Sequence, residues 1–415
     1  MADKTRTYHD PLHGAITLDS ADPVEALLTD LIETAAFQRL RRIRQLGPAS
    51  LTFHGAETSR FTHSLGVMAV ARRAFDRLAS RYAPLRSHRA TVLCAALLHD
   101  IGHGPFSHTA EEVFGSQHEQ WTIAIVERLP EVRSRLDRFA PDLWQSIVQV
   151  YTHRHPVPCV WQIVSSQLDC DRIDYLMRDS YFTGASYGQL DLDRILLALA
   201  YDASSQQLVV ERKGLAAIEH YLVVRSFMYA QIYNHPKNLS ATWVLTQAFN
   251  RARELLISGA LEADPTVTAW LKGPMNQLPL AYYLAGDDIV FTYHLQRWQN
   301  HPDPTLADFC QRYLNRRLLK ALEVTHATPA EQASLLTGVQ QQIGREAVRY
   351  SGLCHTWSKG YSVYQRGIKI KTPQGLEDIN QLSALVRSLS APAQRTWLIY
   401  PAEVTVGLCQ LPEQR

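Results

Sequence analysis

Residues 97–108 read Leu-Leu-His-Asp-Ile-Gly-His-Gly-Pro-Phe-Ser-His and follow an apolar run at 92–96. The run predicts a buried helix, and the glycines and proline after the His99-Asp100 doublet predict that the helix breaks there. Ionisable groups at the end of a buried segment need partners, because an unsatisfied polar group is costly to bury. A bound metal ion would satisfy them.

The overall composition is typical of a globular protein. The chain has 415 residues, of which 46% are hydrophobic and 20% charged, so we expect two or three domains. A net charge of +2 gives no general case for a nucleic-acid or membrane partner. Six scattered cysteines without a Cys-x-x-Cys pair indicate a reducing compartment. With no apolar leader or membrane-length run, we expect a cytoplasmic protein without a membrane partner.

Helical periodicity dominates the chain. Apolar residues recur at three-to-four spacing in segments 22–45, 63–84, 87–100, 107–129, 140–151, 157–180, 190–201 and 213–258. We expect strands at 15–18, 208–211, 361–364, 367–372 and 396–400, and a helix at 376–389. The pattern predicts a mainly α fold with a core at 1–255, a helical extension at 256–345 and a small α+β C-terminal subdomain at 346–415.

Two further segments carry potential metal ligands. His63 lies in the first turns of a predicted helix, and Asp169, Asp171 and Asp174 lie on another helix, where they cannot all share one face. Imidazole and carboxylate together suit Mg, Mn, Fe or Zn. A single buried histidine is more often a hydrogen-bonded core residue, and helical aspartates usually face solvent. The combination favours a metal site, but spacing does not decide which aspartate takes part.

Four segments carry a family resemblance, at residues 37–47, 60–67, 98–108 and 169–175. Taken in this order, they resemble the HD-domain superfamily and, within it, the deoxynucleoside triphosphate triphosphohydrolase branch. The resemblance implies an HD-domain helical core that binds a divalent metal ion. It assigns the metal to His63, His99, Asp100 and Asp171. It also implies a homo-oligomer, as a dimer, tetramer or hexamer, and in some members a nucleotide effector at a second site.

A histidine near the metal is the best general acid at neutral pH. His103 and His108 follow the doublet, and Glu111 lies three residues after His108, where it can orient or charge the imidazole. The resemblance implies that His103, His108 and His118 surround the phosphates, with Glu111 as the acidic partner. Without it, His118 could equally be a solvent-facing residue at the start of a helix.

Candidate substrate contacts come from two helices. Asp171, Tyr175 and Asp179 are spaced at i, i+4 and i+8, so a metal ligand, a ring and a carboxylate share one face, as would suit a sugar beside a phosphate. A buried ion pair of Asp179 with Arg178 or Arg172 is the alternative. The resemblance adds a phosphate-binding Arg225, a sugar-facing Tyr233 and a sugar-contacting Gln45-Leu46 pair, and Arg60 and Arg172 are further candidates. Leu46 or Tyr233 could exclude a 2′-hydroxyl.

The arginines at 39, 41, 42 and 44 spread over more than one helical face. This arrangement favours a solvated, salt-bridged surface over a nucleic-acid site, without excluding nucleic acid.

We expect a metal-dependent phosphohydrolase that converts a deoxynucleoside triphosphate to deoxynucleoside and triphosphate. One alternative keeps the chemistry but changes the substrate to a nucleoside monophosphate, a cyclic or signalling nucleotide, or a nucleic-acid end. Another is a non-catalytic nucleotide- or nucleic-acid-binding regulator with a relict site. Retention of all four metal-ligand candidates and three histidines disfavours the relict.

Overall fold

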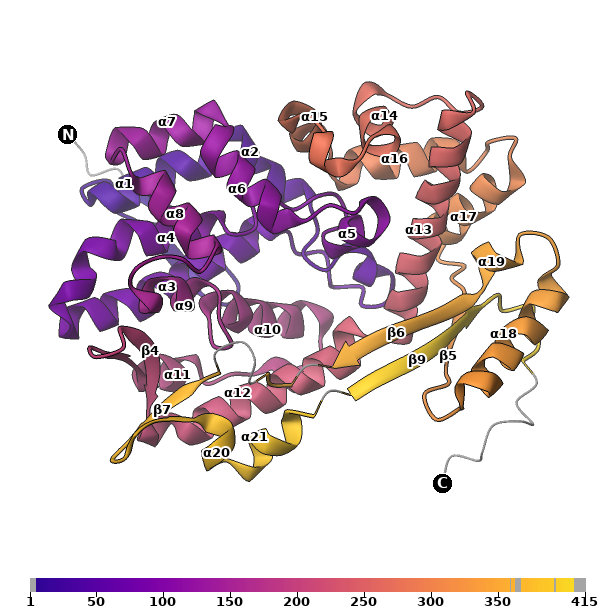
Figure 1. Ribbon diagram of the computed structural model, residues 1–415. Coiled ribbons are helices and arrows are strands. Elements are labelled where there is room, and N and C mark those ends of the chain that lie inside the picture. Colours follow the sequence, from indigo (N-terminus) through magenta and orange to yellow (C-terminus); the bar gives the residue numbers. More distant parts are fainter. Residues whose placement is uncertain (1–4, 359, 363–366, 392, 407–415) are drawn as a thin grey trace.

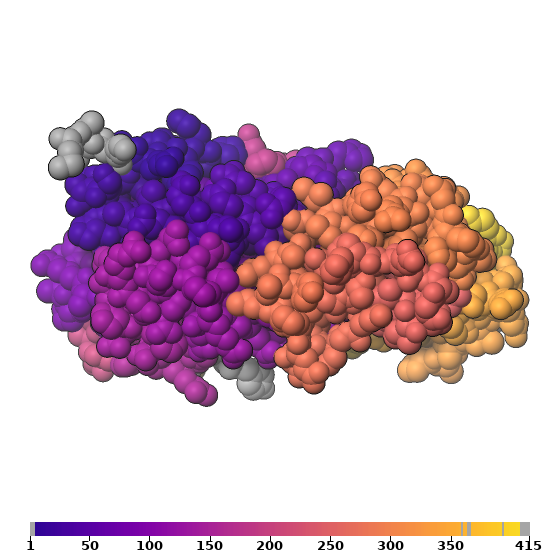
Figure 2. Space-filling view, turned by 90° about the horizontal axis from the view of Figure 1, so that it is seen from above, coloured from indigo at the N-terminus to yellow at the C-terminus, as the bar shows by residue number. Residues whose placement is uncertain are grey.

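The computed structural model describes residues 5–358, 360–362, 367–391 and 393–406. Helices dominate this part of the chain, which confirms the mainly α fold. Figure 1 shows the N-terminal helices gathered on one side and helices α14 to α19 on the other. Figure 2 shows these two parts, indigo to magenta and salmon to orange, in broad contact. No helix in the described ranges is long and apolar enough to cross a membrane.

The N-terminal part contains α1 (Pro23–Ile32), α2 (Ala35–Gln38), α3 (Arg60–Arg81), α4 (Arg89–Leu98), α5 (His108–Phe114), α6 (His118–Arg128), α7 (Pro130–Phe139), α8 (Leu143–Tyr151), α9 (Pro158–Val164), α10 (Cys170–Thr183), α11 (Leu192–Ala198) and α12 (Leu215–Met228). Helix α4 lies in the middle, packed against α3, α8 and α9, and its residues 91–98 are all buried. The apolar run therefore forms the core helix that its composition predicts.

The chain after α4 makes a tight loop before α5 begins at His108. Gly102 is needed there, because a Cβ would overlap the backbone at His118 and Thr122 of α6. Phe106 and Ser107 adopt left-handed backbone angles, with φ of 59° and 58°. The predicted helix 107–129 is wrong as a single element: Gly115, at φ 71°, ends α5, and α6 starts at residue 118.

The predicted helix 213–258 is also interrupted. Helix α12 runs into a π-helical turn (Tyr229–Tyr233) before α13 (Pro236–Ile257) begins. Pro236 lacks a backbone N–H and so starts a new helix instead of continuing the old one. The later helices are α14 (Pro265–Lys272), α15 (Leu280–Ala285), α16 (Asp288–Trp298) and α17 (Pro304–Leu314).

Segment 22–45 divides into α1, α2 and a 3-10 turn (Arg39–Arg42), since Thr34 caps a new helix. Arg39 in this turn is 2% exposed, and its Nε and Nη2 donate to the Gly286 carbonyl oxygen at 3.0 and 2.7 Å. The expected solvated surface is therefore wrong for Arg39, because that carbonyl lies within the fold. Two neighbours form ion pairs as expected: Arg42–Asp287 and Arg44–Glu57.

Three small antiparallel or mixed sheets complete the described fold: β1 (Arg6–Asp10) with β2 (Gly14–Leu18); β3 (Leu199–Asp202), β4 (Gln207–Glu211), β7 (Lys369–Thr372) and β8 (Gly375–Asp378) in that order; and β5 (Lys320–Glu323), β9 (Ala393–Tyr400) and β6 (Gly352–Ser358) in that order. Strand β7 pairs with β4, and β9 with β5, so C-terminal strands join strands from earlier segments. The remaining helices are α18 (Pro329–Ile343), α19 (Ala347–Tyr350), α20 (Ile379–Leu382) and α21 (Ala384–Leu389).

The predicted helix 376–389 is wrong at its start, which belongs to β8, and two short helices follow because Asp378 and Ser383 each cap a new one. Of the predicted strand 361–364, residues 363 and 364 lie outside the described residues, and 361–362 are not in a strand. The domain limits at 255 and 345 stay a prediction.

Candidate metal centre and active site

Four side chains from three segments converge where α3, α4 and α10 meet. His63 is in the first turn of α3, His99 and Asp100 follow α4, and Asp171 is in the first turn of α10. His63 Nε2 lies 3.3 Å from His99 Nε2 and 3.1 Å from Asp171 Oδ1. His99 Nε2 lies 3.3 Å from Asp100 Oδ1. Ligand atoms about 2.0–2.2 Å from one ion stand roughly 3.0–3.5 Å apart, so this donor set fits a divalent metal ion.

The charges in this group also favour a cation. Burial opposes charge on His63, but hydrogen bonds with the Asp171 and Asp174 carboxylates outweigh it and raise the pKa of His63 to about 10. His63 and His99 in turn hold the pKa of Asp171 below its ordinary value despite burial. The carboxylates therefore draw positive charge into the buried site, which a metal ion would supply in place of protons.

The buried carboxylate of Asp174 fixes the orientation of His63 by binding the ring nitrogen that does not face the other candidate ligands. Asp174, on α10, accepts from His63 Nδ1 at 2.8 Å and from Arg178 Nε at 2.8 Å. Its Oδ1 lies 2.6 Å from Nε2 of His13, in the turn between β1 and β2. Arg178 Nη1 reaches on to Asp10 of β1 at 2.8 Å. The N-terminal hairpin is thus linked to His63, whose Nε2 is left to face the other ligands.

Helix α3 needs Gly66 to pass this carboxylate. A Cβ at Gly66 would overlap Asp174 Oδ1 and Arg178 Nη2. We expect Gly66→Ala to lower the free energy of unfolding by about 1–3 kcal/mol in urea titrations, through overpacking. Gly338, in α18, is the matched control: a Cβ there meets nothing within 4 Å, so Gly338→Ala should stabilise by roughly 0.5–1 kcal/mol. Equal effects of the two changes would refute the close packing.

His13 supports the metal group from outside it. We expect His13→Ala to weaken divalent-ion binding by about 10–100-fold in calorimetric titrations, because Asp174 loses one of the partners that fix it against His63. His9, exposed on the same hairpin, is the control, and His9→Ala should leave affinity unchanged. Unaltered affinity in the His13 variant would remove its positioning role.

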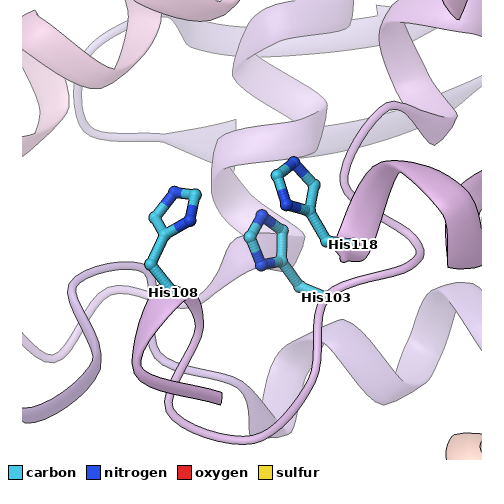
Figure 3. A group of neighbouring side chains, drawn as sticks. All are labelled: His103, His108 and His118. Carbon is cyan, nitrogen blue, oxygen red and sulfur yellow. The ribbon is translucent and has the colours of Figure 1, made fainter. Parts of the chain in front are cut away.

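Three histidines form a second cluster beside the first, drawn in Figure 3. His103 stacks on His118 with ring centroids 3.9 Å apart, and the His108 ring lies edge-on to His103 at 4.9 Å. Glu111 binds both outer rings: its Oε2 is 3.0 Å from His108 Nδ1 and its Oε1 is 2.5 Å from His118 Nδ1. Despite partial burial, these imidazoles lower the pKa of Glu111. Burial and the nearby Arg60 and His118 lower the pKa of His103 well below 6.5.

Both groups open onto one cavity of about 400 Å³. The predicted substrate residues that line it are Gln45, Leu46, Arg60, Arg172, Tyr175, Asp179 and Tyr233. Two of the arginines are already engaged. Arg60 pairs with Asp100 and its Nε donates to Ser107 Oγ at 2.8 Å, while Arg172 Nη1 lies 2.5 Å from Asp169 Oδ2. The volume is in the range of small-molecule sites.

Arg225 does not line this cavity. Its side chain is buried, Nη1 donates to Gln167 Oε1 at 2.9 Å, and its guanidinium carbon lies 5.9 Å from the Tyr229 ring centroid. Tyr229 lines the cavity instead. Arg225, which was predicted to contact phosphate, therefore lies beside a tyrosine, and it is this tyrosine that forms part of the cavity wall.

Asp179 is not in the ion pair that was the alternative from sequence. Arg178 pairs with Asp174 and Asp10, and Asp179 Oδ2 accepts from Tyr233 Oη at 2.9 Å. Its Oδ1 is buried and has no hydrogen-bond partner among the described residues. Burial raises the pKa of Asp179 to about 7, although Tyr233 opposes the shift. Such a carboxyl needs a ligand group to bond with.

The raised pKa of Asp179 predicts a pH-dependent stability. Between its ordinary value of 3.8 and about 7 the native protein holds a proton that the unfolded chain releases, so stability falls as pH rises through this window. We expect the free energy of unfolding of Asp179→Asn, relative to that of the wild type, to increase by about 2–3 kcal/mol between pH 5 and pH 8 in urea titrations. A difference that does not change with pH would contradict the shift.

Several residues of the site, in the cavity wall and behind the candidate metal ligands, carried no clear signal in the sequence. Ser165 and Glu119 complete the wall of the cavity, but a lone serine and a helix-start glutamate are common on surfaces. His13 is 161 residues from its partner Asp174, so only the folded chain shows the contact. Asp174 itself lies three residues after Asp171, a helical spacing that places both carboxylates near His63.

Comparison with known families matches two models to this chain. An HD domain matches residues 60–177, and an HD-associated region matches residues 190–268. The uncharacterized protein YwfO of Bacillus subtilis is 35% identical over 99% of this chain and 95% of its own length. The crystal structure of a phosphohydrolase from Bacteroides thetaiotaomicron superposes with a TM-score of 0.84 at 30% identity, covering 96% of this chain and 100% of that chain.

More distant relatives carry a named activity. The deoxynucleoside triphosphate triphosphohydrolase SAMHD1 homolog of Dictyostelium discoideum is 30% identical over 63% of this chain. SAMHD1 of Gallus gallus is 27% identical over 60% of this chain. The alignments span 52% and 46% of those relatives, about half of their length.

Proposed function

Because the chain belongs to the HD-domain phosphohydrolase family, we propose that it hydrolyses deoxynucleoside triphosphates, in a metal-dependent reaction, to deoxynucleoside and triphosphate. One observation carries this proposal: Asp171, Tyr175 and Asp179 occupy successive turns of α10 and line the same cavity. Eight residues of helix span about 12 Å, which is enough to place a sugar beyond a phosphate. A phosphatase that acts on small monophosphates has no need for residues at the Asp179 end of this helix face.

The metal group and the histidines supply the proposed chemistry. A divalent ion held by His63, His99, Asp100 and Asp171 would lower the pKa of a water molecule and stabilise charge on the phosphate. In the reaction, a water oxygen bonds to the α-phosphorus, and the bond to O5′ breaks with its electron pair on O5′. His108 and His118 share Glu111 through their Nδ1 atoms, so each directs Nε2 elsewhere and, when protonated, can donate to O5′.

The distal residues suit a deoxyribose. Asp179 presents an unpartnered Oδ1 that a 3′-hydroxyl could satisfy, and Tyr233 holds the other oxygen in place. The Tyr175 and Tyr233 rings meet edge-on, 5.9 Å between centroids, and form an angled aromatic wall against which the sugar would pack. Gln45 and Leu46 face the same space, where Leu46 or Tyr233 would leave no room for a 2′-hydroxyl.

The named activity of the SAMHD1 relatives supports the choice of substrate, since 63% and 60% of this chain align with the two relatives named above. From the same resemblance we infer a homo-oligomer, and the test below asks whether a nucleotide effector at a second site is required, as in some members. Arg60 and Arg172, which line the cavity, remain candidates for phosphate contact after exchange of a present partner, and Arg225 would also have to move its side chain to reach the cavity.

Product analysis tests the proposal. The full chain is incubated with each of the four dNTPs, singly and mixed, with Mg or Mn, and the products are resolved by ion-exchange chromatography. We expect equal amounts of deoxynucleoside and triphosphate, and turnover in a mixture but not with single nucleotides would identify an effector. No turnover by metal-loaded protein in any mixture would exclude this substrate class in favour of another nucleotide.

A further inference from the structure

The histidine cluster has the properties of a second metal site. The ring nitrogens of His103, His108 and His118 include one from each residue that lie within 4.8 Å of one another. None of the three belongs to the group around His63, so the two sets of donors are separate. Figure 3 shows the three rings gathered at one place, from the loop after α4 and from the starts of α5 and α6.

Glu111 prepares the two outer imidazoles for such a role. Both Nδ1 atoms bind the same carboxylate, at 3.0 Å for His108 and 2.5 Å for His118. A neutral imidazole that donates from Nδ1 has its lone pair on Nε2. Metal-binding histidines usually give their second nitrogen to a carboxylate or carbonyl in this way, which fixes tautomer and orientation.

The inner imidazole lacks a partner of its own. His103 is 1% exposed, and neither of its ring nitrogens makes a hydrogen bond within the described part of the chain. Its nearest ionic neighbour is Asp100, whose Oδ1 lies 3.3 Å from His103 Nε2. A buried polar group of this kind calls for a ligand. His103 also lines the cavity, so a ligand can reach it from solvent.

We propose that His103, His108 and His118 bind a second divalent ion of the zinc class, apart from the metal held by His63, His99, Asp100 and Asp171. Three imidazoles without a carboxylate ligand prefer borderline ions such as Zn²⁺, Co²⁺ and Ni²⁺ over Mg²⁺. Zn²⁺ takes three protein ligands and keeps a fourth position open, here toward the cavity. Binding requires the stacked His103 and His118 rings to rotate out of their parallel arrangement, so that the ligating nitrogens stand about 3.3 Å apart around the ion.

One consequence rests on the proposed function. A lone pair that binds zinc cannot also carry the proton for O5′, so an ion here blocks hydrolysis and competes with the triphosphate for the same imidazoles. The site would then make the enzyme sensitive to excess zinc. The existence of the site is independent of this consequence and is tested without turnover.

Metal content gives that test. Chelator-treated full-length protein is equilibrated with Zn²⁺, separated from unbound ion by gel filtration, and its metal measured by elemental mass spectrometry. We expect two ions per chain in the wild type, one in the double variant His108→Ala/His118→Ala, and one in Asp171→Ala. His326→Ala, at an exposed histidine, is the control and should keep two. One ion in the wild type, or two in the double variant, would overturn the proposal.

A milder variant covers the case in which the double variant does not fold. Glu111→Gln keeps all three rings, but replaces one of the two accepting oxygens by an NH2 group, which cannot accept from an imidazole N–H. We expect the Kd of the second zinc ion to rise by about 10–100-fold, with circular dichroism unchanged. An unaltered Kd would show that the ion does not bind at these histidines.

Discussion

Asp171→Ala is expected to abolish the binding of metal at the His63 group and to lower kcat by at least about 10³-fold. Asp171 Oδ1 lies 3.1 Å from His63 Nε2 and 3.5 Å from His99 Nε2, so its loss removes a charged ligand from the centre of the group. Metal-assisted charge stabilisation contributes several kcal/mol to phosphoryl chemistry, which corresponds to that change in rate. Elemental analysis and steady-state hydrolysis of dNTPs measure the two effects.

The control for this variant is a carboxylate that is far from the cavity. Asp137, on α7, pairs with Arg133 four residues before it, and Asp137→Ala should leave metal content and kcat unchanged. An Asp171→Ala protein that keeps its metal and turns over at the wild-type rate would remove the metal centre from the mechanism. A variant that loses metal but keeps activity would separate binding from catalysis.

Asp174→Ala is expected to lower the free energy of unfolding by about 3–5 kcal/mol and to weaken metal binding. The substitution leaves the Arg178 guanidinium, whose side chain is 0% exposed, with Asp10 as its one remaining ionic partner among the described residues. Removing one member of a buried ion pair is costly because the remaining charge stays desolvated. His63 also loses the acceptor of its Nδ1–H, and with it a fixed orientation.

Urea titration of apo and metal-loaded protein measures both effects of Asp174→Ala. Asp193, whose side chain is 77% exposed in its pair with Arg73, is the matched control, and Asp193→Ala should change stability by less than about 0.5 kcal/mol. Similar losses of stability in the two variants would show that the buried ion pairs around Asp174 contribute no more than an exposed ion pair.

The sequence pointed to these candidate metal ligands because they lie at recognisable places. His99 and Asp100 follow a run too apolar to be anything but core, and the glycines after them mark the break. The choice of Asp171 came from the resemblance, since helical spacing alone does not separate it from its neighbours. Its geometry beside His63 agrees with that choice.

The remaining features depend on contacts that are distant in sequence. His13 joins Asp174 across 161 residues, and Arg39 finds the Gly286 carbonyl 247 residues away. Tyr229, at the start of the π-helical turn, lies at the cavity wall, whereas Arg225, which the resemblance assigned to phosphate, is bound to Gln167. Local propensity describes each segment, whereas these positions are set by packing between segments.

Hydrolysis in ¹⁸O-labelled water tests the central claim most directly, because it reports which bond breaks. The account predicts deoxynucleoside with an unlabelled 5′-hydroxyl and triphosphate that carries one ¹⁸O on a terminal phosphorus, both absent with Asp171→Ala. Label in the 5′-hydroxyl, or release of labelled phosphate with a deoxynucleoside diphosphate, would contradict it.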